Sequence, residues 1–461
     1  MGSSSSNKLH IVMFPWFAFG HISPFLQLSN KLSSHGVKIS FFSASGNIPR
    51  ISLMVNNNNI KLIPLTLPTV DGLPPGSEST SDMPPHMAEL LKTCLDKMQP
   101  QIESLLTEMK PHFVFFDFCH QWVPQICEKL GIKSMFFSVF SAISTAYLTN
   151  PARVLACAGD IPSLEEMKKP PTGFPESNLL LKSYEARDFL YVFINFSGPG
   201  SCIYDRVLAC MLSCSAILIK SCVELEGPYI DFVKTQFQKP VFLAGPVVPE
   251  PPTGSLDPKW DLWLTTFPSK SVVFCSFGSE TFLKDEQIRQ LITGLEITGL
   301  PFLVVLNFPP REEKAKLSFA QNLVKDKERG VVYTGWVQQQ LILAHDSVGC
   351  YVSHSGFSSV TEGITSDCQL VLLPQKGDQY LNSKLVSRDM KAGVEVNRRD
   401  EDGYFGKEEL CKAVRSVMVD VEEDPGRTIR VNYDKWRKFF LEKEVHEGFI
   451  RDFVKEMEAM V

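Results

Sequence analysis

Short apolar runs alternate with amphipathic helical patterns along this chain, and this alternation constrains its fold more than any other feature. In the first half the apolar runs lie at residues 11–15, 37–42, 61–65, 113–116 and 134–137. Apolar strands separated by helices are typical of a parallel sheet that helices cover on both faces. The pattern restarts with runs at 271–275, 301–306, 349–352 and 370–373. We therefore predict an α/β fold with two Rossmann-like, doubly wound parallel-sheet domains.

A proline-rich stretch separates the two series of strands. Residues 244–252 hold four prolines in nine positions, and neither helix nor sheet continues through such a segment. We predict an N-terminal domain at 1–245, a linker at 246–268, a C-terminal domain at 269–435, and a helix at 436–461 that packs back on the N-terminal domain. Ligands of open α/β sheets bind beyond the carboxyl ends of the strands, so we expect the site in a cleft between the domains.

Charge and hydropathy exclude several classes of partner. The chain has 46 Lys and Arg against 52 Asp and Glu, a net charge of −6, which lacks the basic footprint of a nucleic-acid binder. No apolar run reaches the roughly 18 residues of a membrane-spanning helix, and the N-terminus does not resemble a signal peptide. We expect a cytoplasmic monomer with no stable membrane insertion.

Residues 67–85 interrupt the strand and helix rhythm with five prolines and two glycines. Loops of this length in a compact domain are often functional. Two interpretations stay open here: the rim of a substrate pocket, or a passive surface excursion.

His21 follows the first strand, at the start of the first helix, and Asp117 ends the apolar run 113–116. A histidine at a strand end is suited to act as a general base, and a buried carboxylate paired with it would orient the imidazole and stabilise its protonated form. The alternatives are a histidine that caps its helix and an aspartate that caps a helix beginning near His120.

The turn after the run 271–275 carries small and hydroxyl-bearing residues, including Ser279. Such turns hold phosphate through backbone N–H and hydroxyl donors. The turn matches neither a P-loop nor a dinucleotide fingerprint, so its signal alone is weak.

The segment from Trp336 to Gln379 carries the strongest pattern, and its residue types fit a nucleotide sugar. Trp336 offers a flat face for a base. Residues 354–359 combine a strand end, a glycine turn and a helix N-terminus, which together attract an anion such as a diphosphate. Glu362 lies one turn further and can accept both hydroxyls of a ribose, and Asp378 with Gln379 can bind sugar hydroxyls.

This segment of 44 residues resembles the signature box of the plant family 1 UDP-glycosyltransferases, which have the two-domain GT-B fold. The resemblance implies a UDP-sugar as co-substrate, no cofactor and no metal. It assigns the catalytic dyad to His21 and Asp117. It assigns the donor site to the following residues: Trp336 stacking on uracil, Val337 and Gln339 on the uridine, Glu362 on the ribose, His354, Ser358, Ser359 and Ser279 on the diphosphate, Gly356 and Phe357 in the same binding turn, and Asp378 and Gln379 on the sugar.

The chain departs from the usual family pattern at several positions of this box. Phe357 and Ser358 stand where the family has tryptophan and asparagine, and Gln338 stands where it has proline. Serine reaches less far than asparagine toward a phosphate.

Strings outside the box, such as 17–25, 276–283 and 393–407, resemble the branch of the family that extends sugar chains on flavonoids, and within it the 3-O-glucoside rhamnosyltransferases. The resemblance implies inverting transfer of rhamnose from UDP-rhamnose to a sugar hydroxyl of a flavonol or anthocyanidin 3-O-glucoside. The alternatives are UDP-glucose or UDP-xylose as donor, and a non-catalytic nucleotide-sugar binder.

Overall fold

The computed structural model describes residues 9–83, 87–155, 161–176, 178–195, 202–252, 254–278, 281–308 and 312–461. The chain divides into two compact units. Unit 1 comprises Met1–Leu179, Phe189–Val247 and Glu444–Val461, and unit 2 comprises Leu180–Asp188 and Val248–Lys443.

Unit 1 is built on a parallel sheet with the strand order β3-β2-β1-β4-β5-β6-β7. Its strands are β1 (His10–Phe14), β2 (Lys38–Ala44), β3 (Ile60–Leu65), β4 (Phe113–Phe116), β5 (Lys133–Ser138), β6 (Ala216–Ile219) and β7 (Val241–Leu243). In the register, Ile11 of β1 pairs with Ile39 of β2 on one side and Phe113 of β4 on the other. The strands β6 and β7 were not predicted from the sequence.

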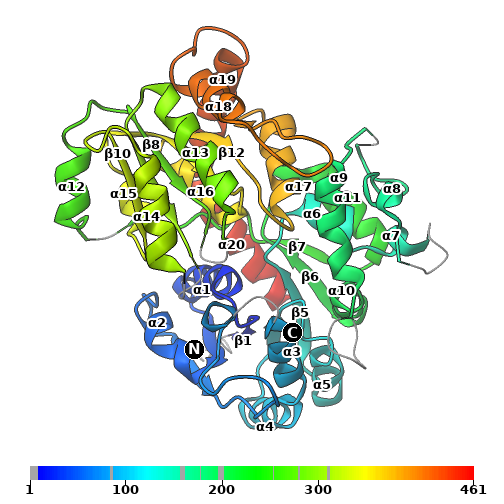
Figure 1. Ribbon diagram of the computed structural model, residues 1–461. Coiled ribbons are helices and arrows are strands. Elements are labelled where there is room, and N and C mark those ends of the chain that lie inside the picture. The colour runs from blue at the N-terminus through cyan, green and yellow to red at the C-terminus, as the bar shows by residue number, and fades with distance from the viewer. Residues whose placement is uncertain are drawn as a thin grey trace. The chain divides into compact units, whose positions relative to one another are not determined.

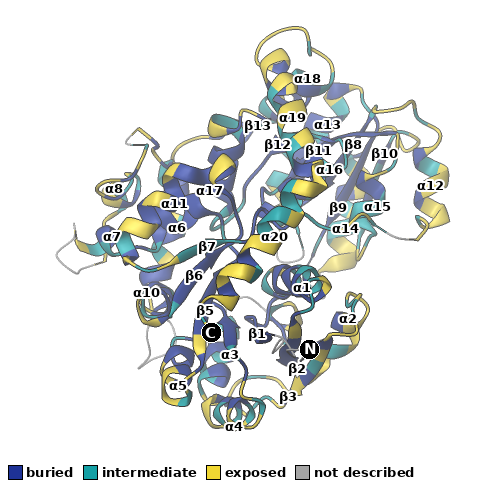
Figure 2. Cartoon of the chain, turned by 180° about the vertical axis from the view of Figure 1, so that it is seen from behind, coloured by how far each residue is buried: buried dark blue, intermediate teal, exposed yellow. Residues whose placement is uncertain are grey.

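Helices connect these strands (Figure 1). They are α1 (Phe19–Ser34), α2 (Ile48–Ser52), α3 (Ala88–Asp96), α4 (Gln99–Met109), α5 (Val123–Leu130), α6 (Ala142–Leu148), α7 (Pro151–Leu155), α8 (Leu164–Met167), α10 (Ile203–Ser213), α11 (Val223–Phe237) and, at the C-terminus, α20 (Lys443–Glu458). Helix α9 (Ser183–Phe189) follows α8 in the chain but belongs to unit 2 up to Asp188. The central strands are buried along their whole length, whereas the helices carry exposed residues on their outer faces (Figure 2).

The C-terminal helix α20 contributes to the core of unit 1. Ile450, Phe453 and Met457 belong to the same buried apolar cluster as the residues of β1 and β4. The ring of Phe453 lies 6.0 Å from that of Phe115. Burying these three side chains offsets the entropy of ordering a terminal segment.

Unit 2 repeats the architecture with the strand order β10-β9-β8-β11-β12-β13, again all parallel. Its strands are β8 (Val272–Ser276), β9 (Phe302–Leu306), β10 (Gly330–Thr334), β11 (Val348–Ser353), β12 (Gln369–Leu372) and β13 (Gly393–Glu395). Its helices are α12 (Pro258–Leu264), α13 (Asp285–Thr298), α14 (Glu313–Leu323), α15 (Gln339–Leu343), α16 (Phe357–Thr365), α17 (Gln379–Lys384), continued by a π-helical turn at Leu385–Asp389, α18 (Lys407–Met418) and α19 (Gly426–Leu441).

The bounds of unit 2 differ from the segments expected from the sequence. Helix α12 lies inside the expected linker 246–268. It begins after Asp257, whose carboxylate caps the helix by accepting the N–H of Lys259. Helix α19, with residues 436–441, also belongs to unit 2, where the indole N–H of Trp436 donates to the carbonyl of Met390. Leu180–Asp188 joins unit 2 although it precedes the linker in the sequence.

Each sheet has one point at which the direction of strand addition reverses. In unit 1 it lies between β1 and β4, and in unit 2 between β8 and β11. The loops that leave neighbouring strands at such a point diverge to opposite faces of the sheet, which creates a crevice for a ligand. His21 and Asp117 follow β1 and β4, and His354 follows β11.

Candidate functional site

His21 and Asp117 lie in direct contact at the strand ends of unit 1. The Nδ1 atom of His21 is 2.8 Å from Oδ2 of Asp117. His21 is the third residue of α1, whose N-cap is Ala18, and α5 begins only at Val123 with Trp122 as its N-cap. The two capping interpretations are therefore wrong, and the structure brings the two residues together as the sequence predicted.

Backbone N–H groups hold the carboxylate of Asp117 in one orientation. Its Oδ2 also accepts the N–H of Trp16 at 3.0 Å, and its Oδ1 accepts the N–H of Phe118 at 2.7 Å. Burial by itself would raise the pKa of Asp117, but His21, nearby His120 and the N–H of Phe118 outweigh burial and hold the pKa below its ordinary value. The carboxylate is thus ionised at neutral pH and accepts a proton-bearing Nδ1, which leaves Nε2 of His21 as the basic nitrogen.

Aromatic rings surround the imidazole of His21. Its ring centroid lies 5.2 Å from that of Phe118 and 5.4 Å from that of Phe140. The described part of the loop 67–85 reaches the same turn, because the N–H of Thr80 donates to the carbonyl of Phe17 at 3.0 Å. Residues 84 and 85 of that loop lie outside the described residues. The imidazole of His21 thus lies among aromatic rings, close to a turn that the loop 67–85 contacts.

The turn between β11 and α16 forms the candidate anion site of unit 2. Ser355 adopts a left-handed conformation with φ of 66°, and Gly356, the N-cap of α16, brings no side chain to cap the helix. Ser358 and Ser359 lie in the first helical turn. The N–H groups and dipole at this end of the helix, together with two hydroxyls, favour an anion.

His354 is enclosed by two glycines at this turn. A Cβ atom on Gly278 would lie 3.0 Å from its Nε2, and one on Gly356 would lie 2.7 Å from it. Burial lowers the pKa of His354 to about 4, and its buried Nδ1 has no hydrogen-bond partner among the residues that the structure describes. The ring is therefore neutral at physiological pH. Ser279, the other predicted diphosphate contact, lies outside the described residues.

The candidate site for the nucleobase begins at Trp336, which lies just after β10 and is 76% exposed. Such exposure is unusual for a tryptophan and is what a stacking surface requires. Glu362 of α16 accepts the side-chain amides of Gln339 at 2.7 Å and Gln340 at 3.3 Å. Val337 closes the same turn, since its carbonyl accepts the N–H of Gln339 at 2.8 Å.

Two side chains of this region were not assigned a role from the sequence. Gln340 shares the carboxylate of Glu362, as described above. Gln338, one of the departures from the family pattern, accepts the N–H of Asp257 at 2.7 Å and donates to the carbonyl of Ser255 at 3.1 Å. Gln338 therefore joins the segment before α12 to the turn that follows Trp336.

Asp378 and Gln379 begin α17 and are each tied to their surroundings. The side-chain oxygen of Gln379 accepts the N–H groups of Gln375 and Lys376 at 3.0 and 3.1 Å. Asn382 was missed by sequence reasoning: its amide donates to Asp378 at 2.9 Å and to the carbonyl of Ser355 at 3.0 Å. Asn382 lies four residues after Asp378, and side chains at this spacing meet on one face of a helix, so the spacing was the signal that could have identified the contact. Asn382 thus links the candidate sugar site to the candidate anion site.

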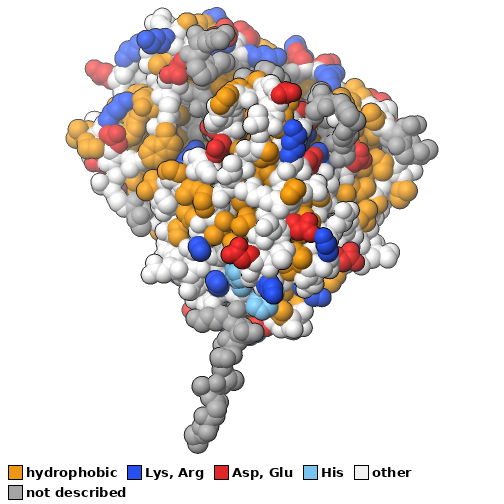
Figure 3. Space-filling view, turned by 90° about the horizontal axis from the view of Figure 1, so that it is seen from below, with side chains coloured by type: hydrophobic (Ala, Val, Ile, Leu, Met, Phe, Trp, Pro, Cys, Tyr) orange, Lys and Arg blue, Asp and Glu red, His pale blue; other side chains and the backbone are white. Residues whose placement is uncertain are grey.

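The described ranges contain neither a metal-binding cluster nor a helix fit to span a membrane. Within them, no cluster of three or more His, Cys, Asp or Glu side chains is arranged to hold a metal ion. No helix in the same ranges is both long and apolar enough to span a membrane. On the face that Figure 3 shows, basic and acidic side chains are interspersed.

Comparison with known proteins gives matches over the whole chain. The family model "UDP-glucoronosyl and UDP-glucosyl transferase" matches residues 206–424, and "Glycosyltransferase, N-terminal domain" matches residues 7–159. The chain is 58% identical to the anthocyanidin-3-O-glucoside rhamnosyltransferase of Petunia hybrida, over 99% of this chain and 97% of the relative. It is 39% identical to the anthocyanidin 3-O-glucoside 2''-O-glucosyltransferase of Ipomoea nil, over the full length of both.

Solved structures share the fold at lower sequence identity. The Arabidopsis thaliana protein UGT89C1, crystallised with UDP-L-rhamnose, superposes with a TM-score of 0.72 at 21% identity, over 98% of this chain and all of that one.

Proposed function

This chain belongs to the plant UDP-glycosyltransferases and has their GT-B fold, and we propose that it transfers rhamnose from UDP-rhamnose to a sugar hydroxyl of a flavonoid 3-O-glucoside. The likeness to a rhamnosyltransferase at 58% identity supports the choice of donor and acceptor. The hydrogen bond between His21 and Asp117 is the observation that supports catalysis rather than binding alone.

In the proposed reaction His21 acts as the general base. Nδ1 of His21 donates to the ionised Asp117, so Nε2 accepts the proton of the acceptor hydroxyl. The oxygen then forms a bond to the anomeric carbon of the donor while the bond from that carbon to the diphosphate breaks, and UDP leaves with the electron pair. Asp117 stabilises the imidazolium that forms. One displacement of this kind inverts the anomeric configuration.

Unit 2 would bind the donor and stabilise its leaving group. Trp336 stacks on the uracil and Glu362 accepts the ribose hydroxyls, while the amides that Glu362 already binds keep its carboxylate in place. The N-terminal turn of α16, with Ser358 and Ser359, attracts the charge that develops on the diphosphate. His354, being neutral, contributes one N–H donor rather than a positive charge.

Unit 1 would bind the flavonoid. The rings of Phe118 and Phe140 around His21 offer an apolar surface for an aromatic aglycone, and the loop that contacts Phe17 lies beside them. We further propose that the enzyme acts in the cytoplasm as a monomer, with UDP-rhamnose as a co-substrate rather than a bound cofactor.

The test is to incubate the protein with a flavonoid 3-O-glucoside and, in separate reactions, UDP-rhamnose, UDP-glucose or UDP-xylose, and to determine the mass of each product. We expect the gain of one deoxyhexose with UDP-rhamnose alone. The gain of a hexose or a pentose instead would contradict the proposed donor. It would not contradict the proposed catalytic role of His21 and Asp117.

His21→Ala provides the control for chemistry. This variant should retain UDP binding, since His21 belongs to unit 1, and should lose transfer with every donor. Transfer by the variant at the wild-type rate would contradict the general-base role. UDP binding by the wild type without transfer to any acceptor would favour the alternative of a non-catalytic nucleotide-sugar binder.

A further inference from the structure

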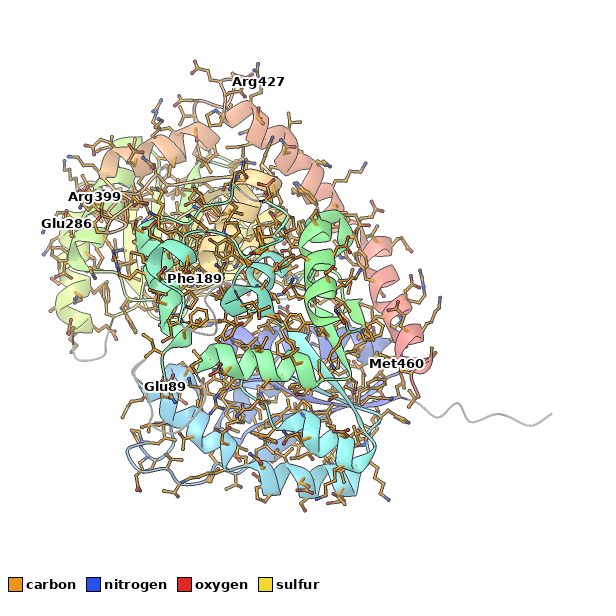
Figure 4. All side chains as sticks on the ribbon, turned by 90° about the vertical axis from the view of Figure 1, so that its right-hand side faces the viewer. Glu89, Phe189, Glu286, Arg399, Arg427 and Met460 are labelled. Atoms are coloured by element: carbon orange, nitrogen blue, oxygen red, sulfur yellow. The ribbon has the colours of Figure 1, made fainter. Side chains whose placement is uncertain are left out.

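Helix α9 packs in unit 2 although the sequence around it belongs to unit 1. Its first residues are held by Asp400: the N–H of Ser183 donates to the Asp400 carboxylate at 3.1 Å, and the N–H of Tyr184 donates to the Asp400 carbonyl at 3.1 Å. Phe189, labelled in Figure 4, is the last residue of α9 and the point at which the chain returns to unit 1.

Asp188 connects α9 to the loop that precedes the candidate sugar site. Its Oδ2 accepts the N–H of Gly377 at 2.9 Å. Gly377 has a φ of 57°, the left-handed region that glycine adopts without strain, and the next residue is Asp378. The conformation of the loop immediately before Asp378 is therefore held by a carboxylate from a distant part of the sequence.

Further contacts from α9 reach the same loop and the helix that follows it. The rings of Tyr184 and Tyr380 meet edge to face with centroids 5.7 Å apart, and the hydroxyl of Tyr380 donates to the carbonyl of Gln375 at 2.7 Å. At the other end of α17, Nζ of Lys384 lies 3.3 Å from buried Glu185 and 2.9 Å from Glu395. Helix α9 thus contacts α17 at both of its ends.

These contacts restrain the loop 375–379 from two sides. Gln379 closes the loop from within by accepting the N–H groups of Gln375 and Lys376. Asp188 restrains it from outside at Gly377. The residues proposed for the uridine, Trp336 and Glu362, lie on other elements.

We propose that Asp188 is a positioning residue for the donor sugar, which holds the loop 375–379 so that Asp378 and Gln379 present their polar groups to the sugar rather than to UDP. This inference rests on the proposed function, because it takes these two residues as the sugar contacts. It predicts an effect on the binding of UDP-sugars that UDP itself does not share.

The experiment measures the affinity of UDP, UDP-rhamnose and UDP-glucose by calorimetry for the wild type, Asp188→Ala and Asp188→Asn. Alanine removes the acceptor for the N–H of Gly377, and we expect the UDP-sugar that the wild type binds to bind about tenfold more weakly. The affinity for UDP should stay within about twofold. Asparagine keeps an oxygen that can accept from Gly377 and should restore most of the sugar-dependent affinity.

Asp326 provides the matched control. Its carboxylate also accepts backbone N–H groups in a loop of unit 2, those of Glu328 and Arg329, but at the amino-terminal end of β10. Asp326→Ala should therefore change the affinities for UDP and UDP-sugars equally or not at all. If Asp188→Ala fails to fold, Asp188→Ser, whose shorter side chain does not reach Gly377, replaces it with the same expectation.

The outcomes separate this inference from the proposed function. A wild-type protein that binds UDP but no UDP-sugar would contradict the proposed function. A wild-type protein that binds a UDP-sugar, together with Asp188→Ala binding it equally well, would overturn only the role of Asp188. Equal loss of UDP and UDP-sugar affinity in folded Asp188→Ala would also overturn it, because Asp188 would then support the whole unit rather than the sugar site.

Discussion

Replacing Asp117 with asparagine tests the proposed mechanism with the smallest change in shape. Within the described part of the chain, the carboxylate has three N–H donors: Trp16 and His21 at Oδ2, and Phe118 at Oδ1. An asparagine that keeps its oxygen toward Trp16 and His21 retains the orientation of the imidazole but turns its NH₂ toward the N–H of Phe118. The variant thus loses the negative charge and one hydrogen bond, while the position of His21 is preserved.

The structure sets the size of the expected effect. A carboxylate and an imidazolium about 4 Å apart at an effective dielectric constant of about 20 attract by roughly 4 kcal/mol. The side chain of Asp117 is 1% exposed and that of His21 is 15% exposed, so solvent screens this attraction only in part. Because the amide oxygen still accepts from His21, we expect a net loss of about 2–3 kcal/mol of transition-state stabilisation, or a kcat roughly 30- to 150-fold lower.

The assay compares initial rates of wild type and Asp117→Asn at saturating acceptor, with the UDP-sugar that the wild type uses. UDP affinity should not change, and the lost hydrogen bond to Phe118 should lower the free energy of unfolding by about 1–3 kcal/mol. A variant whose kcat stays within threefold of the wild type, while its stability falls as expected, would refute the charge-stabilising role of Asp117.

Three other predictions follow from single contacts. Trp336→Ala should weaken UDP binding by about 1–3 kcal/mol in calorimetry but change the free energy of unfolding by less than about 0.5 kcal/mol, since the residue is 76% exposed; unchanged UDP affinity would contradict stacking. Burial lowers the pKa of His120 from the ordinary value of 6.5 to about 4. As the pH falls from 6.5 to 4, His120 therefore becomes protonated in the unfolded chain but not in the folded one. Stability should fall by about 1.4 kcal/mol per pH unit there on account of His120, and His120→Gln should show a shallower slope in denaturant titrations; an equal slope would contradict a neutral His120. Gly349→Ala would place a Cβ against the backbone carbonyl of Lys270 and should cost about 2–3 kcal/mol in urea unfolding, whereas wild-type stability would show that the strand can shift.

Much of the fold was accessible because its signals are local. The apolar runs that predicted strands coincide with β1 to β5 and with β8, β9, β11 and β12 to within a few residues at each end. The strands β6, β7, β10 and β13 were missed. β7 and β13 have only three residues each, and β10 is only partly buried, which weakens their apolar patterns. β6 has four buried apolar residues, as β4 does, so its length does not explain why it was missed.

The contact between His21 and Asp117 was predictable for a related reason. Both residues end or follow strands, and parallel strands bring their carboxyl ends to one edge of a sheet. Pairing β1 directly with β4 then leaves 2.8 Å between the two side chains, although 96 positions separate them.

The sequence by itself determined the strand and helix pattern, the residue types at the strand ends and the family, since these depend on neighbouring residues and on motifs read along the chain. The tertiary structure alone decided which partners each side chain has: the amides of Trp16 and Phe118 on Asp117, the link from Asn382 to Ser355, and the hold of Asp188 on Gly377. Such hydrogen bonds depend on distances of about 3 Å between segments far apart in sequence, and only the packed fold sets those distances.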